Sequence, residues 1–183
     1  MQPAAERPMS DLIAQSLSML RTSVDRWSAI ARIDSELLAR PPKPGEWSAI
    51  QTLQHAVDTE LAVYRSRVLA ILAGETFPGF DPEADGHVDR VTLSAGELVA
   101  LLADRRAQGL ETLETLTPDD LPKTGVHSVL GTVTMAELVN QWAAHDTMHI
   151  VQAERALMQA FIPASGPWRG YFTDHDVDLP AAG

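Results

Sequence analysis

Apolar residues recur at helical spacing along four long segments of the chain. The first segment spans about residues 10 to 38, and the others begin near residues 48, 94 and 134. The stripe of the first segment consists of Leu12, Ile13, Leu17, Leu20, Val24, Trp27, Ile30 and Ile33. This spacing is typical of amphipathic helices, and no segment alternates convincingly with a period of two residues. The pattern therefore predicts an all-α fold in which four long helices pack as a four-helix bundle.

Capping boxes mark the starts of three of these helices. In a capping box, a Ser or Thr accepts a hydrogen bond from the backbone three residues later, and a Glu or Gln at that later position bonds back. The pairs are Ser48 with Gln51, Ser94 with Glu97, and Thr134 with Glu137. We expect a helix to begin directly after each pair's first residue.

Segments that contain Pro and Gly separate the helices, at residues 40–46, 74–89 and 116–132. The second and third of these segments are longer than the connection between antiparallel helices needs to be, and long loops often form lids or rims of functional sites.

A length of 183 residues suits one core, so residues 1–183 are expected to form a single domain. Residues 1–9 and 178–183 are expected to be flexible ends.

Composition excludes several classes of function. The chain has 14 basic and 25 acidic residues and a net charge of −11, which argues against nucleic-acid binding because phosphate contacts need clustered Lys and Arg. It has no cysteine, so it carries no disulfide, thiolate ligand or cysteine nucleophile. No run of 18 apolar residues and no signal peptide are found, so we expect a cytoplasmic protein that does not enter a membrane.

Candidate chemistry begins with His145 and His149, which lie one helical turn apart in the fourth segment. Their stripe also contains Leu138, Trp142, Gln152 and Ala156. The spacing suits two ligands of one metal, and it equally suits two neighbours on a packed stripe. A buried imidazole must satisfy both ring nitrogens, and this face offers the pair no acid.

A third histidine, His55, lies in the second segment. The broad apolar side of that segment carries Ile50, Leu53, Val57, Leu61, Tyr64, Val68 and Ile71. A wheel at 100° per residue turns His55 away from this side, onto a face of small residues with Thr52, Thr59, Ala62 and Ser66. Taken alone, His55 is predicted to face solvent, although a small-residue face also suits close packing or a bound group.

Three stretches resemble the DinB family of bacterial helical bundles, which includes the YfiT-like proteins: "GEWSAIQTLQHAVDTE", "GVHSVLGTVTMAELVNQWAAHDTMHIVQAERAL" and "GPWRGYF". The similarity covers about residues 10–175. It implies that His55, His145 and His149 bind one divalent metal, zinc or nickel, with at least one coordination position open. Because mycothiol-dependent isomerases are relatives of the family, the resemblance also implies a low-molecular-weight thiol as a cofactor. It implies a homodimer as well, as does the broad apolar side of the second segment.

Two other metal sites fit the sequence less well. The string "HDTMH" is similar to the HExxH motif of zinc proteases, but Asp146 is shorter than glutamate and points about 100° away from His145. Glu154 is too close in sequence to be the third ligand of such a protease. A di-iron bundle needs Glu-x-x-His on two helices, and no such tetrapeptide occurs.

The other histidines are assigned structural or surface roles. His87, in the second loop, is expected to be solvated, and His175 is expected to lie at the surface. His127 is expected to fix its loop by a hydrogen bond. Trp142 is expected to belong to the core more than to contact a substrate.

Candidates for contacts with the metal ligands or the substrate are Asp58, Thr59, Trp142 and Gln152. Asp58 is predicted to be a solvated carboxylate rather than a partner of the site. Gln152, one turn after His149, is a plausible hydrogen-bond partner for that ligand. No residue is identified as a catalytic base.

The function expected from these features is that of a metal-dependent enzyme acting on small molecules, as a thiol-dependent transferase or isomerase. The alternatives are a metal-dependent hydrolase and a non-catalytic, metal-binding stress-response bundle. A deep pocket with a charged anchor above the triad favours an enzyme, whereas a sealed apolar surround favours a binding protein.

Overall fold

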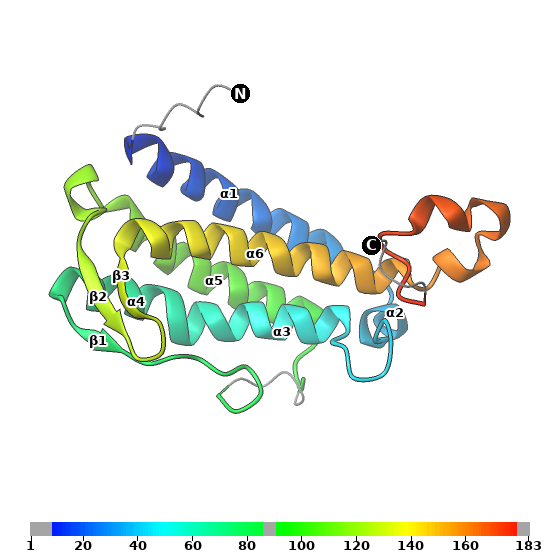
Figure 1. The fold of residues 1–183 in the computed structure, drawn as a ribbon. Coiled ribbons are helices and arrows are strands. Elements are labelled where there is room, and N and C mark those ends of the chain that lie inside the picture. The colour runs from blue at the N-terminus through cyan, green and yellow to red at the C-terminus, as the bar shows by residue number, and fades with distance from the viewer. Residues whose placement is uncertain (1–8, 86–90, 179–183) are drawn as a thin grey trace, which may run out of the picture.

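Four long helical units form the bundle in the computed structural model, which describes residues 9–85 and 91–178. The helices are α1 (Met9–Ile30), α2 (Ser35–Ala39), α3 (Ala49–Thr59), α4 (Arg65–Ala73), α5 (Ala95–Glu114) and α6 (Met135–Met158). α1 packs against α5 and α6, and α3 packs against the same two helices. The predicted all-α bundle is confirmed (Figure 1). The ends expected to be flexible lie almost wholly outside the described residues.

The direction of the helices explains the long second loop. α3, α4 and α5 run from right to left in Figure 1, whereas α1 and α6 run from left to right. Because α4 and α5 share a direction, the chain between them must return along the length of the bundle. The connection between α5 and α6 instead turns at one end of the bundle, where it forms a small hairpin.

The first predicted helix is divided, so its expected extent to residue 38 was wrong. α1 ends at Ile30, and the carboxylate of Asp34 accepts hydrogen bonds from the backbone of Glu36 and Leu37 to cap the separate helix α2. A side chain that accepts from backbone N–H groups in this way starts a new helix. Ile33, counted in the apolar stripe, is consequently exposed.

A π-helical turn, Glu60–Tyr64, joins α3 to α4. A π-turn holds more residues than an α-turn, so the face of every later residue shifts relative to a regular wheel. The predicted apolar side therefore fails locally: Leu61, which was on it, is 47% exposed, and Val63, which was not, is buried, whereas Tyr64 is buried as predicted. The three predicted capping boxes are all present, at the starts of α3, α5 and α6.

A three-stranded sheet covers one end of the bundle, although no strands were predicted. β2 (Thr124–His127) and β3 (Gly131–Thr134) form an antiparallel hairpin, and β1 (Thr76–Phe77) pairs with β2 in parallel. These strands are two to four residues long, too short for a period of two to be recognised.

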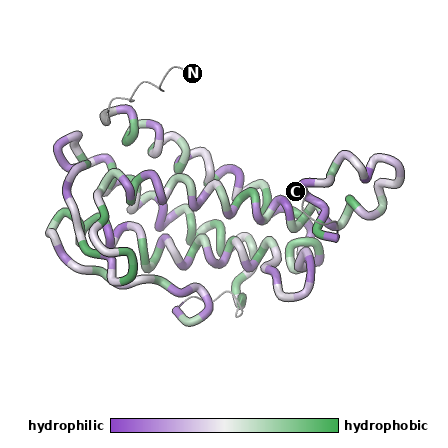
Figure 2. Tube along the Cα trace, in the orientation of Figure 1, coloured by the Kyte–Doolittle hydropathy of each residue, from purple (hydrophilic) through white to green (hydrophobic). Residues whose placement is uncertain are grey.

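Two clusters of buried apolar side chains fill the bundle. One contains Leu20, Tyr64 and Trp142, and the other contains Trp27 and Leu53. Hydrophobic positions recur along each helix, as the amphipathic pattern requires (Figure 2). No helix in the described part of the chain is long and apolar enough to cross a membrane.

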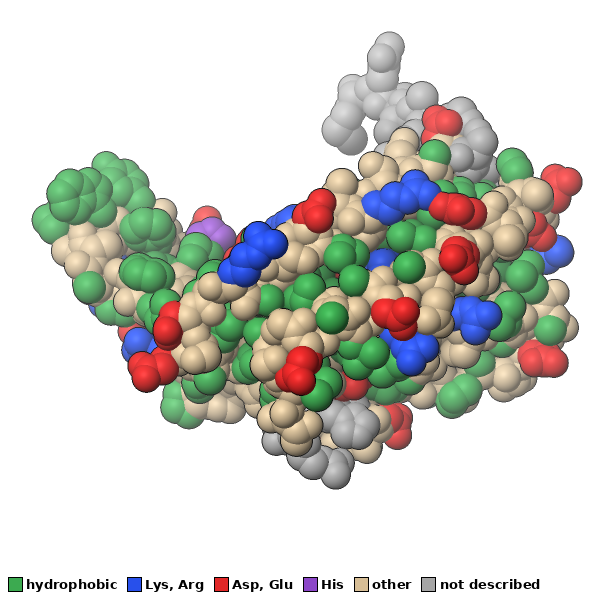
Figure 3. Space-filling view, turned by 180° about the vertical axis from the view of Figure 1, so that it is seen from behind, with side chains coloured by type: hydrophobic (Ala, Val, Ile, Leu, Met, Phe, Trp, Pro, Cys, Tyr) green, Lys and Arg blue, Asp and Glu red, His purple; other side chains and the backbone are tan. Residues whose placement is uncertain are grey.

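The chain after α6 projects from the end of the bundle (Figure 1). It contains two 3₁₀ segments, Ile162–Ala164 and Gly166–Phe172. The amide of Gln159 donates to the carbonyl oxygen of His175 at 2.9 Å and so ties this segment to the bundle. Hydrophobic side chains gather on the segment (Figure 3), where Phe161, Trp168 and Tyr171 are exposed.

Candidate metal centre

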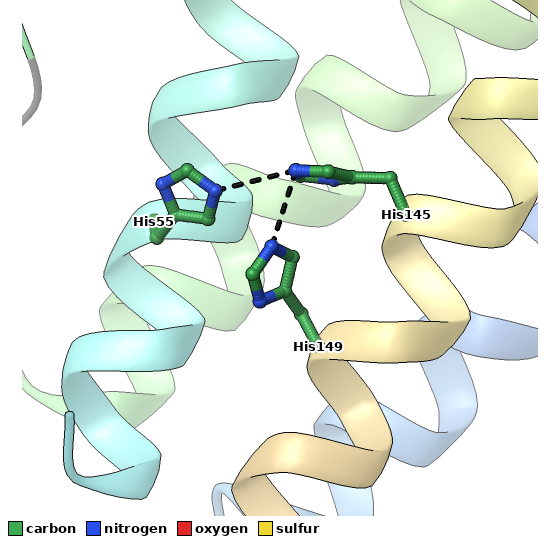
Figure 4. Close-up of side chains that lie close together, drawn as sticks. All are labelled: His55, His145 and His149. Atoms are coloured by element: carbon green, nitrogen blue, oxygen red, sulfur yellow. Dashed lines mark hydrogen bonds between the residues drawn. The ribbon is translucent and has the colours of Figure 1, made fainter. Parts of the chain in front are cut away.

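Three imidazole rings converge between α3 and α6. His55 comes from α3, and His145 and His149 come from successive turns of α6 (Figure 4). The Nε2 atom of His145 lies 3.3 Å from that of His55 and 3.1 Å from that of His149. One nitrogen from each ring lies within 4.8 Å of the other two. The structure thus brings together all three histidines that the resemblance implied.

His55 is buried, so its predicted exposure to solvent is corrected. Residues 52–60 are all buried, because α3 packs against α5 and α6 and the loop before it covers another side. The indole ring of Trp47, in that loop, lies 5.0 Å from the ring of His55. On the small-residue face, Thr52 and Thr59 are buried in this packing, whereas Ala62 and Ser66 are exposed.

The imidazoles are held in the neutral form. Burial lowers the pKa of His55 to about 3 and that of His145 to about 4, with a further effect of neighbouring histidines on each. Burial also lowers the pKa of His149. A neutral imidazole keeps one nitrogen lone pair free, which is the form that binds metals.

Gln152 fixes which nitrogen of His149 is free. Its Oε1 lies 2.7 Å from Nδ1 of His149, so Nδ1 donates and Nε2 keeps a lone pair aimed at His145. Nδ1 of His55 is buried without a hydrogen-bond partner in the described residues. Nitrogen lone pairs crowded in this way need a proton or a cation between them.

The donor set fits a divalent cation. Ligand atoms at about 2.0–2.1 Å from a tetrahedral ion lie about 3.3–3.4 Å from one another. The Nε2 separations of 3.3 and 3.1 Å are close to that value. Three imidazoles leave a tetrahedral ion one open position, and imidazole ligands do not discriminate between zinc and nickel.

A charged network lies beside the triad, between α5, α6 and the π-turn. The guanidinium of Arg106 contacts Asp146 at 2.8 Å and Glu60 at 2.8 Å, and all three side chains are buried. The indole N–H groups of Trp27 and Trp142 donate to these carboxylates. The network therefore links the two apolar clusters, which contain one tryptophan each.

Asp146 faces away from the triad, as its position on the helical wheel predicted. Burial opposes its ionisation, but the charge of Arg106 and hydrogen bonds from Arg106, Ser23 and Trp27 hold its pKa below the usual range. It is an anion committed to Arg106 and not a base for the metal site. Arg106 was not predicted to belong to a site or core, although it lies on an apolar stripe of α5 with Leu98 and Leu102.

The other candidate residues divide between site and core. The hydroxyl of Thr59 donates to the carbonyl oxygens of His55 and Ala56, and its side chain reaches the pocket described below. Trp142 is fully buried, and its ring stacks on Tyr64 with centroids 4.6 Å apart. Asp58 is buried and accepts a hydrogen bond from Gln54, so its predicted solvation is corrected.

An open pocket of about 450 Å³ lies against the triad. Aromatic and aliphatic side chains form much of its wall, namely Trp47, Phe80, Val129 and Leu130. Arg67 is the only cation, and no Asp or Glu is present, among the described residues that line it. The surroundings of the triad are thus open and carry a charged side chain, and they are not a sealed apolar surround.

His127 fixes the hairpin turn, as expected. Its Nδ1 accepts hydrogen bonds from the backbone N–H groups of Val129 and Leu130, at 3.1 and 3.2 Å. The ring also lines the pocket, which the sequence did not indicate. His175 is exposed, as predicted, and His87 lies outside the described residues.

The fold and the convergent histidines define a four-helix-bundle protein with a candidate metal centre. Residues 18–153 match the family model of the DinB superfamily, and the chain belongs to this superfamily. The matched range contains all three histidines.

Two similar proteins are described as metal-dependent. A protein from Oceanobacillus iheyensis, named as a candidate metal-dependent hydrolase, is 24% identical over 147 residues, which are 79% of this chain and 85% of that protein. The structure of YfiT from Bacillus subtilis, described as a probable metal-dependent hydrolase with an unusual four-helix bundle topology, superposes with a TM-score of 0.67 at 16% identity. The superposition covers 87% of this chain and 91% of that one. At this identity, the likeness to YfiT establishes the fold alone.

Proposed function

We propose that the protein is a metal-dependent enzyme acting on small molecules, with His55, His145 and His149 as the ligands of one divalent metal. The observation that carries the proposal is the convergence of three neutral imidazoles at the wall of an open pocket. A buried structural site would have no need of a pocket. The pocket volume of about 450 Å³ suits a small molecule.

His55, His145 and His149 would hold a divalent cation, which would supply Lewis acidity that lowers the pKa of a water molecule or a thiol and so favours the nucleophilic form. The residues of the chain do the remaining work. Gln152 orients His149, Thr59 lies on the pocket wall, and Trp47 shields the rings of His55 and His149. The apolar wall excludes water from the body of a bound substrate.

Two nucleophiles are compatible with this site. A low-molecular-weight thiol, giving a transferase or isomerase, is favoured by the lack of a carboxylate base among the described residues of the pocket. The free pKa of a thiol is about 8.5, far below that of water, so a thiol in this site would release its proton to solvent at neutral pH more completely than water and would have less need of a base. Water, giving a hydrolase, is favoured by the names of the two similar proteins.

Metal analysis of the purified protein tests the proposal directly. We expect one zinc or nickel ion per chain, lost in His149→Ala while the helical content stays intact. Gln152→Ala keeps the ligands but frees the His149 ring, so its metal affinity should fall by about 10- to 100-fold. His175→Ala, an exposed histidine outside the triad, is the control and should bind normally. Stoichiometric metal binding by His149→Ala would refute the assignment.

The nucleophile is then identified with the metal-loaded protein. Calorimetry with mycothiol, bacillithiol and glutathione should reveal binding that depends on the metal if a thiol is the cofactor. Hydrolysis of a model ester or amide without any thiol binding would establish the hydrolase instead. Full metal occupancy with neither property would leave a non-catalytic metal-binding bundle.

A further inference from the structure

Arg67 is a half-buried cation with no carboxylate partner among the described residues. By contrast, Arg21, Arg26, Arg106 and Arg169 each contact a carboxylate. The only hydrogen bond of Arg67 to the described chain runs from Nη2 to the carbonyl oxygen of Pro78, at 3.1 Å. Most of its five N–H donors therefore remain available, although burial has removed part of their hydration.

The position of Arg67 is set by the π-turn. His55, Thr59, Val63 and Arg67 follow one another at intervals of four residues, and all four line the pocket. In an α-helix, four residues advance by about 40° more than a full turn, so such a row would wind away from one face. The wider turn at Glu60–Tyr64 offsets part of that advance. Arg67 consequently shares a pocket wall with the metal ligand His55.

Phe77 brings Arg67 and His127 together. The guanidinium carbon lies 5.5 Å from the centroid of the Phe77 ring, and the His127 ring lies 5.5 Å from the same centroid. Burial, followed by the charge of Arg67, lowers the pKa of His127, so its ring is neutral. Because Nδ1 of His127 accepts two backbone N–H groups, the ring proton is on Nε2. The pocket thus has a second donor beside the cation.

We propose that Arg67, assisted by Nε2–H of His127, binds the carboxylate of a small substrate whose reactive group is held at the triad. This inference rests on the proposed function and names its substrate class: a carboxylate joined to an apolar body. The apolar body would lie between the two ends of the pocket, against Phe80 and Leu130. Arginine suits this task because its planar donors match the two oxygens of a carboxylate.

The charge of the whole molecule makes such an anchor necessary. With a net charge of −11, the protein repels anions at long range. A local cation in a partly dehydrated pocket acts at close range, where salt screens it less than surface charges. An anionic substrate therefore needs a residue such as Arg67, whereas a neutral substrate would leave Arg67 only its contacts with Phe77 and Pro78.

Matched ligands test this inference. ω-Mercaptocarboxylic acids of three to eleven carbons are compared by calorimetry with the corresponding ω-mercapto alcohols, on zinc-loaded protein. The thiol end binds the metal in both series, and only the acid reaches Arg67 with a charge. We expect one chain length at which the acid binds about 10- to 100-fold more tightly than the alcohol.

Variants assign the preference to Arg67. Arg67→Gln should bind acid and alcohol equally, and Arg67→Lys should keep part of the preference because it keeps the charge. Arg65→Gln removes a nearby exposed arginine, which hydrogen-bonds to Thr112, and should behave as wild type. Zinc content and circular dichroism confirm that each variant is folded and loaded.

The outcomes separate this inference from the proposed function. Failure to bind zinc would refute the metal centre itself. Two outcomes would overturn the role of Arg67 and leave the metal centre intact. In one, the protein binds zinc but does not prefer the acid to the alcohol at any chain length. In the other, Arg67→Gln retains the preference in full.

Discussion

Arg106 is enclosed by groups that depend on its charge. Glu60 and Asp146 both contact its guanidinium, and Nη1 donates to the hydroxyl of Ser23 at 2.7 Å. The arginine is 1% exposed, so water cannot replace it. Removing the cation would leave two buried carboxylates without their partner.

We predict that Arg106→Met lowers the free energy of unfolding by about 3–5 kcal/mol, the usual cost of breaking a buried ion pair from one side. Arg21→Met is the matched control, because the Arg21–Glu114 pair is exposed and such pairs contribute about 0–1 kcal/mol. Urea denaturation measures both. Equal effects of the two substitutions would contradict the assigned role of Arg106.

Single residues also show which features of the site could be predicted from the sequence and which could not. His145 and His149 were found from a spacing that a helix converts directly into proximity, but His55 needed the family resemblance because its wheel position pointed to solvent. Arg67 and Arg106 were missed as functional or structural groups. Their charge is visible in the sequence, whereas their burial depends on contacts among helices far apart along the chain.

At the scale of elements, local signals were the reliable ones. The three capping boxes are formed by residues three positions apart, and each begins a helix where expected. The π-turn at Glu60–Tyr64 has no such signal. It coincides with the burial of Glu60 against Arg106 and Trp142, contacts that only the assembled bundle provides. The regular wheel therefore failed only within the turn, at Leu61 and Val63, whereas the predicted apolar residues of α4, Val68 and Ile71, are buried.

The Trp142 side chain of α6 reaches α5 at Gly109, which leaves room for it. A Cβ atom at this position would lie 2.5 Å from the indole ring of Trp142, which is itself fully buried. We predict that Gly109→Ala lowers the free energy of unfolding by about 1–3 kcal/mol through overpacking. Gly96→Ala, in the first turn of the same helix and with open space around its Cβ, should be neutral or stabilising. Thermal or urea denaturation compares the two, and a destabilisation by Gly96→Ala as large as that by Gly109→Ala would contradict the packing argument.

At the scale of the whole molecule, apolar surface remains uncovered on the second helical unit. Leu61 and Leu69 are each 47% exposed, whereas Val63, Tyr64 and Val68 are buried. Most of the apolar side that indicated a dimer is buried within one chain, since Leu53, Val57, Tyr64, Val68 and Ile71 belong to the core. Leu61 is the exposed member of that side, and we expect a second copy to cover it together with Leu69.

We predict that the protein forms a homodimer through this surface. Light scattering at micromolar concentration should give a mass near 2 × 19.9 kDa rather than 19.9 kDa. Because each copy carries a net charge of −11, the copies repel one another, and salt should favour the dimer by screening that repulsion.

Two variants test where the copies meet. Leu69→Glu should reduce the mass toward that of a monomer. Ala100→Glu replaces an exposed alanine on α5, adds the same charge elsewhere, and should leave the dimer in place at moderate salt. A mass near 20 kDa for the unmodified protein at all salt concentrations would contradict the prediction, and a dimer that withstands Leu69→Glu would locate the interface on another face.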